Sequence, residues 1–295
     1  MQPREPMPPI VHNDQDSTGE AVRSTGNEQR ESAPRFAFGR NWRRFLDDVD
    51  EVRIEVAERS LREMLGRDQL DGLRFLDIGS GSGLFSLAAR RLGAVVHSFD
   101  FDPDSVACTA ALRERWAPGD DGWSVAHASI LDTAAMEGSG TWDVVYSWGV
   151  LHHTGALWEA IGNAADRVAS GGSLFIAIYN DQGRVSRWWA AEKRLYVRGP
   201  RPMRAVLLAV GVAGFWGVPF VRAAVRGRWW SPSKGYEQRR GMSPWTDLVD
   251  WMGGHPFEVA TPVEIVDFLG PRGFHLERSR LTQRLGCNEL VFERS

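Results

Sequence analysis

Cysteine is scarce in this chain: only Cys108 and Cys287 occur among its 295 residues. Two thiols are too few for a disulfide framework, which excludes a small disulfide-stapled secreted fold and fits a reducing compartment. Neither cysteine has neighbours at metal-ligand spacing, so we expect both to be structural and expect no bound metal. The scarcity of cysteine leads us to expect a cytoplasmic protein. The start of the chain also lacks the basic and apolar segments of a signal peptide.

A strong net charge is missing as well, since 35 basic and 38 acidic residues give a formal net charge of −3. This balance gives no reason to expect a nucleic-acid partner. The hydrophobic fraction of 43% is ordinary for a soluble globular protein. A chain of 295 residues can bury a full core, as one large domain or as one domain with an insertion.

The most informative stretch is an apolar strand that runs into a glycine-rich turn. Leu73–Ile78 is typical of a buried parallel strand, and the turn Gly79-Ser80-Gly81-Ser82-Gly83 leads into a helix over Leu84–Leu92. The hydride-transfer fingerprint G-x-G-x-x-G would require glycine at position 84, where this chain has leucine. The Asp77 carboxylate would repel a pyrophosphate and attract an ammonium or a sulfonium. These residues favour a cationic nucleoside such as S-adenosylmethionine (SAM).

A second acid follows at the end of the next apolar segment. Ala94–Phe99 predicts a strand that ends at Asp100, about 20 residues past the glycines, where an acid reaches ribose hydroxyls in such folds. Phe101 comes next and is suited to packing on an adenine face. Asp102 and Pro103 are typical of the N-cap and the first position of a helix.

Together these residues resemble a known family. Asp77-x-Gly79-x-Gly81-x-Gly83 with Asp100 is similar to motif I and the following acidic strand end of class I SAM-dependent methyltransferases. Trp142–His153 resembles their fourth strand and the loop after it, and Gly171–Ile178 resembles their fifth strand. Within that family, these motifs most resemble those of the UbiG/UbiE-like small-molecule methyltransferases of ubiquinone biosynthesis. The resemblance covers residues 36–181 and 255–294, and it implies SAM as cofactor with S-adenosyl-L-homocysteine (SAH) as its product.

Strands and helices alternate from Leu73 onward, which predicts a Rossmann-like α/β fold with helices on both faces of a sheet. Seven strands are expected, near 73–78, 94–99, 123–127, 143–147, 172–178, 274–283 and 288–293, the last two resembling the family's closing antiparallel hairpin. The expected organisation is a disordered tail over 1–35, poor in large apolar side chains, a SAM-binding core over 36–181, a helical insertion over 182–254 and the end of the core over 255–295.

The segment before the first strand is aromatic and then amphipathic. Phe36, Phe38 and Trp42 are placed to cover the cofactor, as the N-terminal segment often does in resembling enzymes, or else they pack on the sheet. A helix is expected from about Arg43 to Leu65, with apolar positions at Phe45, Val49, Val52, Val56, Leu61 and Leu65.

Ligands of such sheets bind beyond the carboxyl ends of the strands. Many relatives place an acid on the adenine amino group after the third strand, whereas the aligned residue here is Ser129, with Asp132 as a substitute. The residues expected to bind the cofactor lie at this edge and are Asp77, Gly79, Ser80, Gly81, Gly83, Asp100, Phe101, Asp102, Ser129, Ile130, Ser147, Trp148 and Gly149.

The insertion is basic and contains an uncharged run. Residues 182–240 hold thirteen basic residues and only two acidic ones, Glu192 and Glu237, and residues 205–221 carry no charge. Three interpretations remain open: a helical lid over the substrate, an anchor on an anionic membrane surface through 184–230, or a packing or homodimer face. The run is short for a membrane span, broken by three glycines and Pro219 and basic on both flanks, so we do not expect it to cross a membrane. We expect the insertion to lie over the carboxyl edge of the sheet and to enclose an apolar pocket.

The expected reaction is methylation of a hydroxyl on a small or lipid-linked molecule, helped by a base that removes the hydroxyl proton. His152 or His153 is the candidate base, although packing by His152 and helix capping by His153 explain them equally well. Methylation of carbon or nitrogen and a non-catalytic SAM-binding scaffold are the alternatives. The acceptor-site candidates, each of which also has a purely structural explanation, are Tyr179, Asn180, Asp181, Asp247, Asp250, Trp251 and His255.

Overall fold

The computed structural model describes residues 42, 46, 49–132, 138, 140–227, 244–283 and 285–295, without the side chains of 244, 246, 247 and 250. All of them belong to the unit Pro34–Ser295. The tail expected over 1–35, the aromatic residues Phe36, Phe38 and Phe45, and the side chains of Asp247 and Asp250 lie outside the described residues.

Seven strands form one sheet in the order β3-β2-β1-β4-β5-β7-β6. Strands β1 to β5 are parallel, and β7 is antiparallel to both of its neighbours, β5 and β6. The predicted α/β fold with its closing hairpin is confirmed, and each strand lies close to its expected range. The strands are β1 Arg74–Ile78, β2 Val95–Asp100, β3 Trp123–His127, β4 Trp142–Trp148, β5 Val168–Tyr179, β6 Phe274–Arg280 and β7 Cys287–Arg294.

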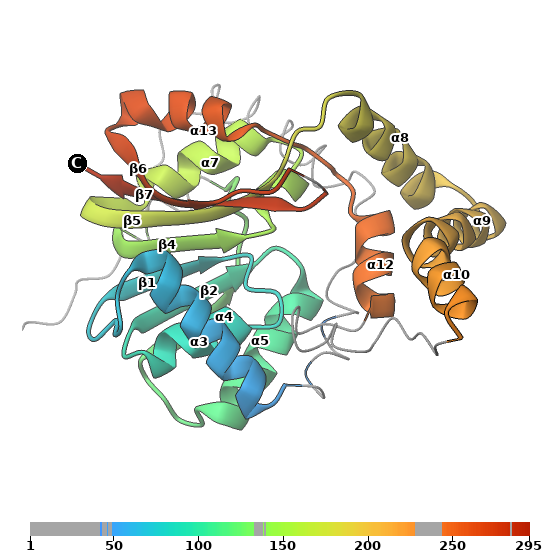
Figure 1. Cartoon of the computed structure of the whole chain (residues 1–295). Helices are drawn as coiled ribbons and strands as arrows, with labels where there is room; N and C mark the ends of the chain where they lie inside the picture. Colours follow the sequence, from blue (N-terminus) through green and yellow to red (C-terminus); the bar gives the residue numbers. More distant parts are fainter. Residues whose placement is uncertain are drawn as a thin grey trace, which may run out of the picture. The chain divides into compact units, whose positions relative to one another are not determined.

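Helices cover both faces of this sheet (Figure 1). Successive residues of a strand point to opposite faces. Leu76 and Ile78 therefore lie in one core with α7 and α13, while Phe75 lies in the other core with α3, α4 and α5. Each such fully buried side chain contributes about 1.5–3 kcal/mol to folding. These helices are α3 Glu51–Leu65, α4 Leu84–Arg91, α5 Pro103–Trp116, α7 Leu157–Asp166 and α13 Pro262–Leu269.

Helix α3 begins later than the sequence predicted and buries only part of the expected face, with Leu61 and Leu65 buried as predicted. Asp50 caps it by accepting a hydrogen bond from the backbone N–H of Arg53 at 2.9 Å, so the helix begins at Glu51. Val52 is 60% exposed, which makes that expected core position wrong. Val52 lies two residues, more than half a turn, before Ile54 of the stripe that does face the sheet, whereas Val56 lies next to the buried Ala57 and is half-buried. That stripe consists of Ile54, Ala57, Glu58, Leu61, Met64 and Leu65.

The described residues of the insertion form four helices beyond the carboxyl ends of the parallel strands (Figure 1). They are α8 Arg184–Arg198, α9 Arg201–Val212, α10 Val218–Val225 and α12 Pro244–Gly253, with the π-helical turn η2 Ala213–Gly217 joining α9 to α10. The insertion touches the sheet through α12, because the ring centroid of Trp251 lies 5.3 Å from that of Tyr179 at the end of β5. Its expected position at this edge therefore agrees with the structure.

Helices α9 and α10 form one continuous helix, Arg201–Val225, so the expectation that glycine and proline break this run is wrong. A π-helical turn has wider hydrogen-bonded rings than an α-helical turn. Since η2 directly precedes the α-helical turn with Pro219, it offers room for a ring that would crowd an ordinary helix interior. Among the described residues, this helix is long and apolar enough to cross a membrane by length and composition.

One side of the Arg201–Val225 helix packs on α12. Leu248 and Met252 of α12 form a buried apolar cluster with residues of α8 and of the long helix. Gly211 allows a close approach here, because a Cβ at this position would lie 3.0 Å from the Met252 sulfur. The helix is therefore held against α8 and α12 between Leu207 and Trp216, while its other side faces outward.

Candidate functional site

The glycine turn after β1 is built by backbone conformation and by contacts with β2. Gly79, Gly81 and Gly83 have φ angles of 75°, 55° and 80°, a region that side chains other than glycine rarely adopt. The N–H groups of Gly79 and Ser80 both donate to the Phe99 carbonyl, at 2.8 and 3.1 Å. A Cβ at Gly79 would collide with the Val150 side chain. The sequence thus fixes a tight turn whose backbone a ligand can approach closely.

Asp100 at the end of β2 faces this turn. Its carboxylate accepts hydrogen bonds from the N–H groups of Gly81 and Asp102, each at 2.9 Å. Burial raises the pKa of Asp100 to about 6, against the lowering effect of these hydrogen bonds. Asp102 also caps α5 as expected, accepting from Asp104 N at 3.0 Å. The second predicted acid is therefore held beside the glycines by the protein itself.

Trp42 lies over the same turn. A Cβ added to Gly81 would sit 3.1 Å from its indole Nε1. Ser80 is tied to α5 on the other side, with its hydroxyl 2.9 Å from that of Thr109. Trp42 therefore contacts the glycine turn, and the coverage of the cofactor by this aromatic segment stays a prediction.

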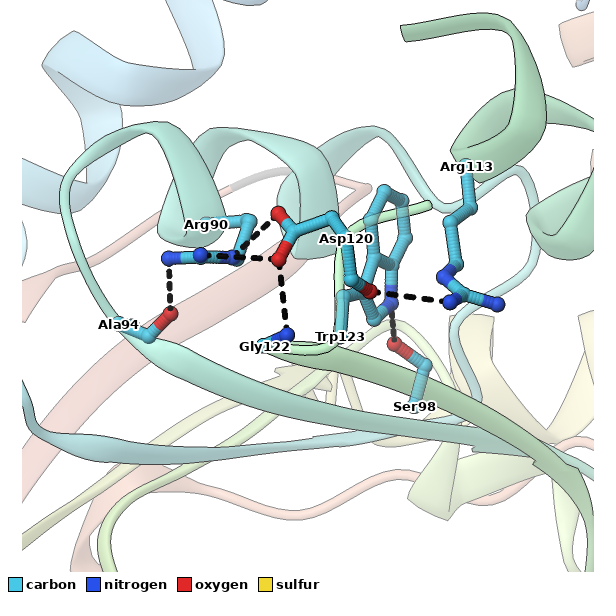
Figure 2. A network of polar contacts seen from close by, with 7 residues as sticks. All are labelled: Arg90, Ala94, Ser98, Arg113, Asp120, Gly122 and Trp123. Carbon is cyan, nitrogen blue, oxygen red and sulfur yellow. Dashed lines mark hydrogen bonds and ion pairs between the residues drawn. The ribbon is translucent and has the colours of Figure 1, made fainter. Parts of the chain in front are cut away.

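Asp77 lies inside the protein and has an internal partner. Its carboxylate accepts a short hydrogen bond from the Ser86 hydroxyl of α4. Ser86 in turn lies 2.7 Å from the Ser98 hydroxyl, which accepts from Trp123 Nε1 at 2.8 Å, the bond drawn in Figure 2. Burial raises the pKa of Asp77 to about 7. Its contact with a cationic ligand stays a prediction.

A second polar network ties α4 and α5 to the segments that lead into β2 and β3 (Figure 2). Arg90 of α4 pairs with both carboxylate oxygens of Asp120, at 2.6 and 2.9 Å, and donates to the Ala94 carbonyl at 3.1 Å. Arg113 of α5 donates to the Asp120 carbonyl at 3.0 Å. The sequence analysis did not single out this network, because its members are 4 to 30 residues apart and form no motif.

The residues expected around the adenine are partly engaged elsewhere. The Phe101 carbonyl lies 2.9 Å from His127 Nε2, and its ring centroid lies 6.3 Å from that of His127. The Ser129 hydroxyl accepts from Leu131 N at 3.2 Å. Ile130 is buried in the core, and its carbonyl accepts from Asn163 at 2.8 Å. These residues follow β2 and β3 as predicted, with Ile130 contributing to packing.

The residues after β4 connect neighbouring strands. Ser147 is buried and donates to the Ile78 carbonyl at 3.0 Å, which links the ends of β4 and β1. Gly149, with a φ of 76°, donates to the Ala177 carbonyl of β5 at 3.1 Å. Trp148 is 42% exposed and donates from Nε1 to Glu289 of β7 at 3.3 Å.

His152 and His153 form the short helix η1 Leu151–His153 with Leu151, and both contact Tyr179. The ring centroids of His152 and Tyr179 are 3.9 Å apart. The Tyr179 N–H points at His152 Nδ1 over 3.4 Å, so the neutral imidazole carries its proton on Nε2. His153 Nδ1 lies 2.6 Å from the Pro256 carbonyl and donates to it, which leaves the lone pair on Nε2. Of the two, His153 has the tautomer that can accept a proton at Nε2.

Burial keeps both imidazoles neutral. Desolvation lowers the pKa of His152 well below its usual value, and the nearby His153 and Lys193 act in the same direction. Desolvation likewise lowers the pKa of His153 to about 3, against the effect of the Pro256 carbonyl. An imidazole of this kind is in the unprotonated form that a base requires, but it is a weak base.

The remaining acceptor-site candidates differ in their surroundings. Trp251 belongs to the aromatic group around Tyr179, and burial lowers the pKa of His255. Asn180 donates to the Thr282 carbonyl and accepts from Asn288, both at 3.0 Å, so its amide holds the β6–β7 hairpin. Asp181 accepts from the Gly183 N–H at 2.7 Å, just before α8.

Sequence reasoning missed Lys193 of α8, which lies in the same aromatic group. Its ammonium is buried and lies 4.3 Å from the ring centroid of Trp251 and 5.0 Å from that of Phe257. The sequence does distinguish this residue, because only two of the chain's 35 basic residues are lysines and Lys193 is one of them.

Comparison with known protein families shows what this arrangement is similar to. A family model described as a methyltransferase domain matches residues 49–216. A ubiquinone biosynthesis O-methyltransferase from Caulobacter sp. (strain K31) is 33% identical over 129 residues, which cover 44% of this chain and 50% of that protein. The protein of the same description from Sinorhizobium medicae is 31% identical over an equal length. The chain spans about half the length of the curated relatives it matches.

Solved structures share the fold. The magnesium protoporphyrin IX methyltransferase from Synechocystis PCC 6803, crystallised with bound SAH, matches with a TM-score of 0.52 and 15% sequence identity. The match covers 94% of this chain and 100% of that one. At this identity the likeness concerns the architecture of the chain.

Proposed function

We propose that this chain, which belongs to the methyltransferase domain family and is a class I SAM-dependent methyltransferase, methylates a hydroxyl group of a small or lipid-linked molecule. The observation that carries the proposal is the glycine turn with Asp100 held 2.9 Å from the Gly81 N–H. Relatives described as ubiquinone biosynthesis O-methyltransferases support oxygen as the methylated atom.

The sheet order separates two halves of the carboxyl edge. The chain moves from β1 outward to β3 on one side and from β4 to β5 on the other, so the switch point lies between β1 and β4. Ligands of open α/β sheets bind at such a point. The glycine turn and Asp100 support a cofactor site on the β1–β2 half, and in this proposal the acceptor binds on the β4–β5 half, with His153 and Tyr179.

The residues on the cofactor half fit SAM. Three glycines free the backbone for close approach, a carboxylate stands beside them to accept from ribose hydroxyls, and Trp42 lies over Gly81. When bound, SAM supplies an activated methyl group on a positively charged sulfur. The protein aligns the acceptor oxygen, keeps water away and offers the Nε2 lone pair of His153 to the hydroxyl proton.

Incubation of the protein with methyl-labelled SAM and a host metabolite extract, followed by identification of the labelled product, tests this function. We expect label on an oxygen atom. Label on carbon or nitrogen would assign the alternative reactions, and SAM binding by calorimetry without transfer to any component would favour a scaffold protein.

We also propose that the Arg201–Val225 helix rests on an anionic membrane surface while the enzyme itself is cytoplasmic. Only 6% of its apolar window is buried, and its outer side exposes large apolar side chains. These are Val206, Val210, Val218, Phe220, Val221 and Val225. Full burial of such a side chain contributes about 1.5–3 kcal/mol, so inserting a few of them outweighs the cost of association.

Charge supports the same surface. Arg201 and Arg204 precede the uncharged run, Arg222 and Arg226 follow it, and residues 193–227 contain no acidic residue. Each such cation near an anionic leaflet contributes about 1 kcal/mol. Because α12 holds the other side of the helix, the helix lies along the surface in this proposal and does not cross the bilayer.

Co-sedimentation with phosphatidylglycerol vesicles tests the contact, with phosphatidylcholine vesicles as the uncharged comparison. We expect salt-sensitive binding that Val210→Asp with Phe220→Asp abolishes and that Val263→Asp, an equally exposed valine on α13, leaves intact. Equal pelleting of all variants would contradict membrane binding by this face. A dimer in light scattering that the double variant dissociates would instead indicate that this face joins two copies of the chain.

A further inference from the structure

Four buried side chains form a chain of hydrogen bonds that ends at Asp77. Trp123 of β3 donates from Nε1 to the Ser98 hydroxyl of β2 at 2.8 Å (Figure 2). The hydroxyls of Ser98 and Ser86 lie 2.7 Å apart, and Ser86 of α4 donates to Asp77 Oδ2 near the end of β1. All four residues are at most 2% exposed, so bulk water does not compete for these bonds.

When Asp77 is ionised, this chain has a single direction. An indole N–H only donates, and a carboxylate only accepts. Ser86 gives its one hydroxyl proton to Asp77, so Ser98 must be the donor in the contact between the two serines. Ser98 in turn accepts from Trp123, and every proton of the chain points towards the carboxylate. Hydrogen bonds aligned in this way polarise one another, and in a buried site they are stronger than in water.

The other surroundings of Asp77 oppose its charge. Burial raises the pKa of Asp77 to about 7, the Ser86 hydrogen bond lowers it, and the charge of Asp100 on β2 raises it. Tyr146, the titratable neighbour on β4, pairs with Asp77 in the strand register and is buried as well. Among the described residues, Ser86 is the one hydrogen-bond donor to the carboxylate, which leaves Oδ1 available to a ligand.

We propose that Ser86, Ser98 and Trp123 are positioning residues that hold Asp77 ionised, and that they thereby set the preference of the cofactor site for a positively charged nucleoside over a neutral one. The inference rests on the proposed contact of Asp77 with the cationic end of SAM. Ser98 and Trp123 act through Ser86, and Ser86 acts through Asp77. A tryptophan two strands away from Asp77 thus takes part in cofactor selection.

The test compares two ligands by calorimetry on the full chain. SAM carries a sulfonium and an ammonium, whereas 5′-methylthioadenosine shares its adenosine part and carries neither. The ratio of the two affinities reports on the cationic end, because the glycine turn and Asp100 act on the shared part.

Ser86→Ala should lower this ratio about tenfold at pH 6 and only about twofold at pH 8. These factors follow if loss of the hydrogen bond raises the pKa of Asp77 by about one unit from its value of about 7, because the ionised fraction then falls most at low pH. A purely structural defect would weaken both ligands together and would not depend on pH in this way.

Ser98→Ala should change the ratio in the same direction by a smaller factor, because it shortens the chain and leaves Ser86 in place. Ser86→Thr keeps the hydroxyl and should retain most of the wild-type ratio. Ser105→Ala is the matched control, since it removes the hydroxyl of an equally buried serine on α5, and it should leave the ratio unchanged.

Binding of 5′-methylthioadenosine shows for each variant that the fold of the cofactor site is intact. A wild-type protein that binds neither ligand would overturn the proposed function itself. Wild-type ratios in both Ser86→Ala and Ser98→Ala would overturn the positioning role alone, as would a loss in Ser86→Ala that is equal at pH 6 and pH 8.

Discussion

The Asp100 carboxylate of β2 and the Gly81 N–H of the turn after β1 form a hydrogen bond of 2.9 Å. The bond joins the two sequence features from which the cofactor was inferred, although they lie 19 residues apart. It holds a carboxylate beside a turn whose Gly79 and Ser80 N–H groups also donate to β2, at the Phe99 carbonyl. This pair is the structural centre of the cofactor half.

Replacing Asp100 by asparagine should weaken SAH binding about 10- to 100-fold. The amide oxygen can still accept from Gly81, but hydrogen bonds to a charged acceptor contribute about 1.5–3 kcal/mol and the charge is lost. Calorimetry measures the affinity, and Asp267→Asn, an exposed acid of α13, serves as the control. Unchanged affinity in Asp100→Asn would remove this residue from the cofactor site.

Binding of SAM should release protons near pH 6. The pKa of Asp100 is raised to about 6 and that of Asp77 to about 7, so both carboxyls are partly protonated there in the free protein. A cationic ligand with hydroxyl donors favours the ionised forms, and affinity should therefore fall on acidification. Calorimetry in buffers of different ionisation enthalpy measures the release, which should vanish at about pH 8 and shrink in Asp100→Asn.

Gly79→Ala should destabilise the protein more than Gly171→Ala does. Both glycines have positive φ, 75° and 72°, and alanine in that region costs roughly 1–2 kcal/mol. A Cβ at Gly79 also collides with Val150, whereas a Cβ at Gly171 has nothing within 4 Å. Urea unfolding of the two variants separates backbone strain from steric conflict. Equal losses would show that Val150 moves aside freely.

The contribution of Asp77 to stability should fall as the pH rises from about 4 to about 7, so Asp77→Asn should gain stability relative to the wild type across this window. Burial raises the folded-state pKa of Asp77 from 3.8 to about 7, so the folded state binds more protons than the unfolded state within that window. The corresponding loss is on the order of a few kcal/mol. Urea unfolding across this pH range measures it. The raised pKa values of Asp100 and Glu192 act in the same direction and the lowered pKa values of His152 and His153 in the opposite direction, so the difference between variant and wild type isolates Asp77.

The strands of the sheet and the glycine turn could be predicted from short sequence patterns. A buried strand, a glycine turn and a helix N-cap are each determined by a few neighbouring residues. Which face of α3 is buried was harder to predict. Val52 and Val56 are as apolar as the residues that face the sheet, and only packing against α4 decides which stripe is buried.

The acceptor half depends on contacts that the sequence does not display. Lys193 and Trp251 are 58 positions apart, and nothing in either segment alone indicates that their side chains meet. Asn180 illustrates the opposite error: it follows β5, where acceptor residues were expected, but both ends of its amide hold Thr282 and Asn288. The polar residues after β5 predicted where this end of the sheet lies, but they did not show which of them are structural.

The insertion leaves and rejoins the core at a single place. Asn180 forms a β-bridge with Ala260, and the Ala260 N–H donates to the Tyr179 carbonyl at 3.1 Å. The segment between Asn180 and Ala260 is thus closed off at its two ends by these bonds. The register of the seven strands does not depend on how long that segment is. The residues of the insertion can therefore change to fit a different acceptor without altering the glycine turn and Asp100 at the β1–β2 end of the sheet.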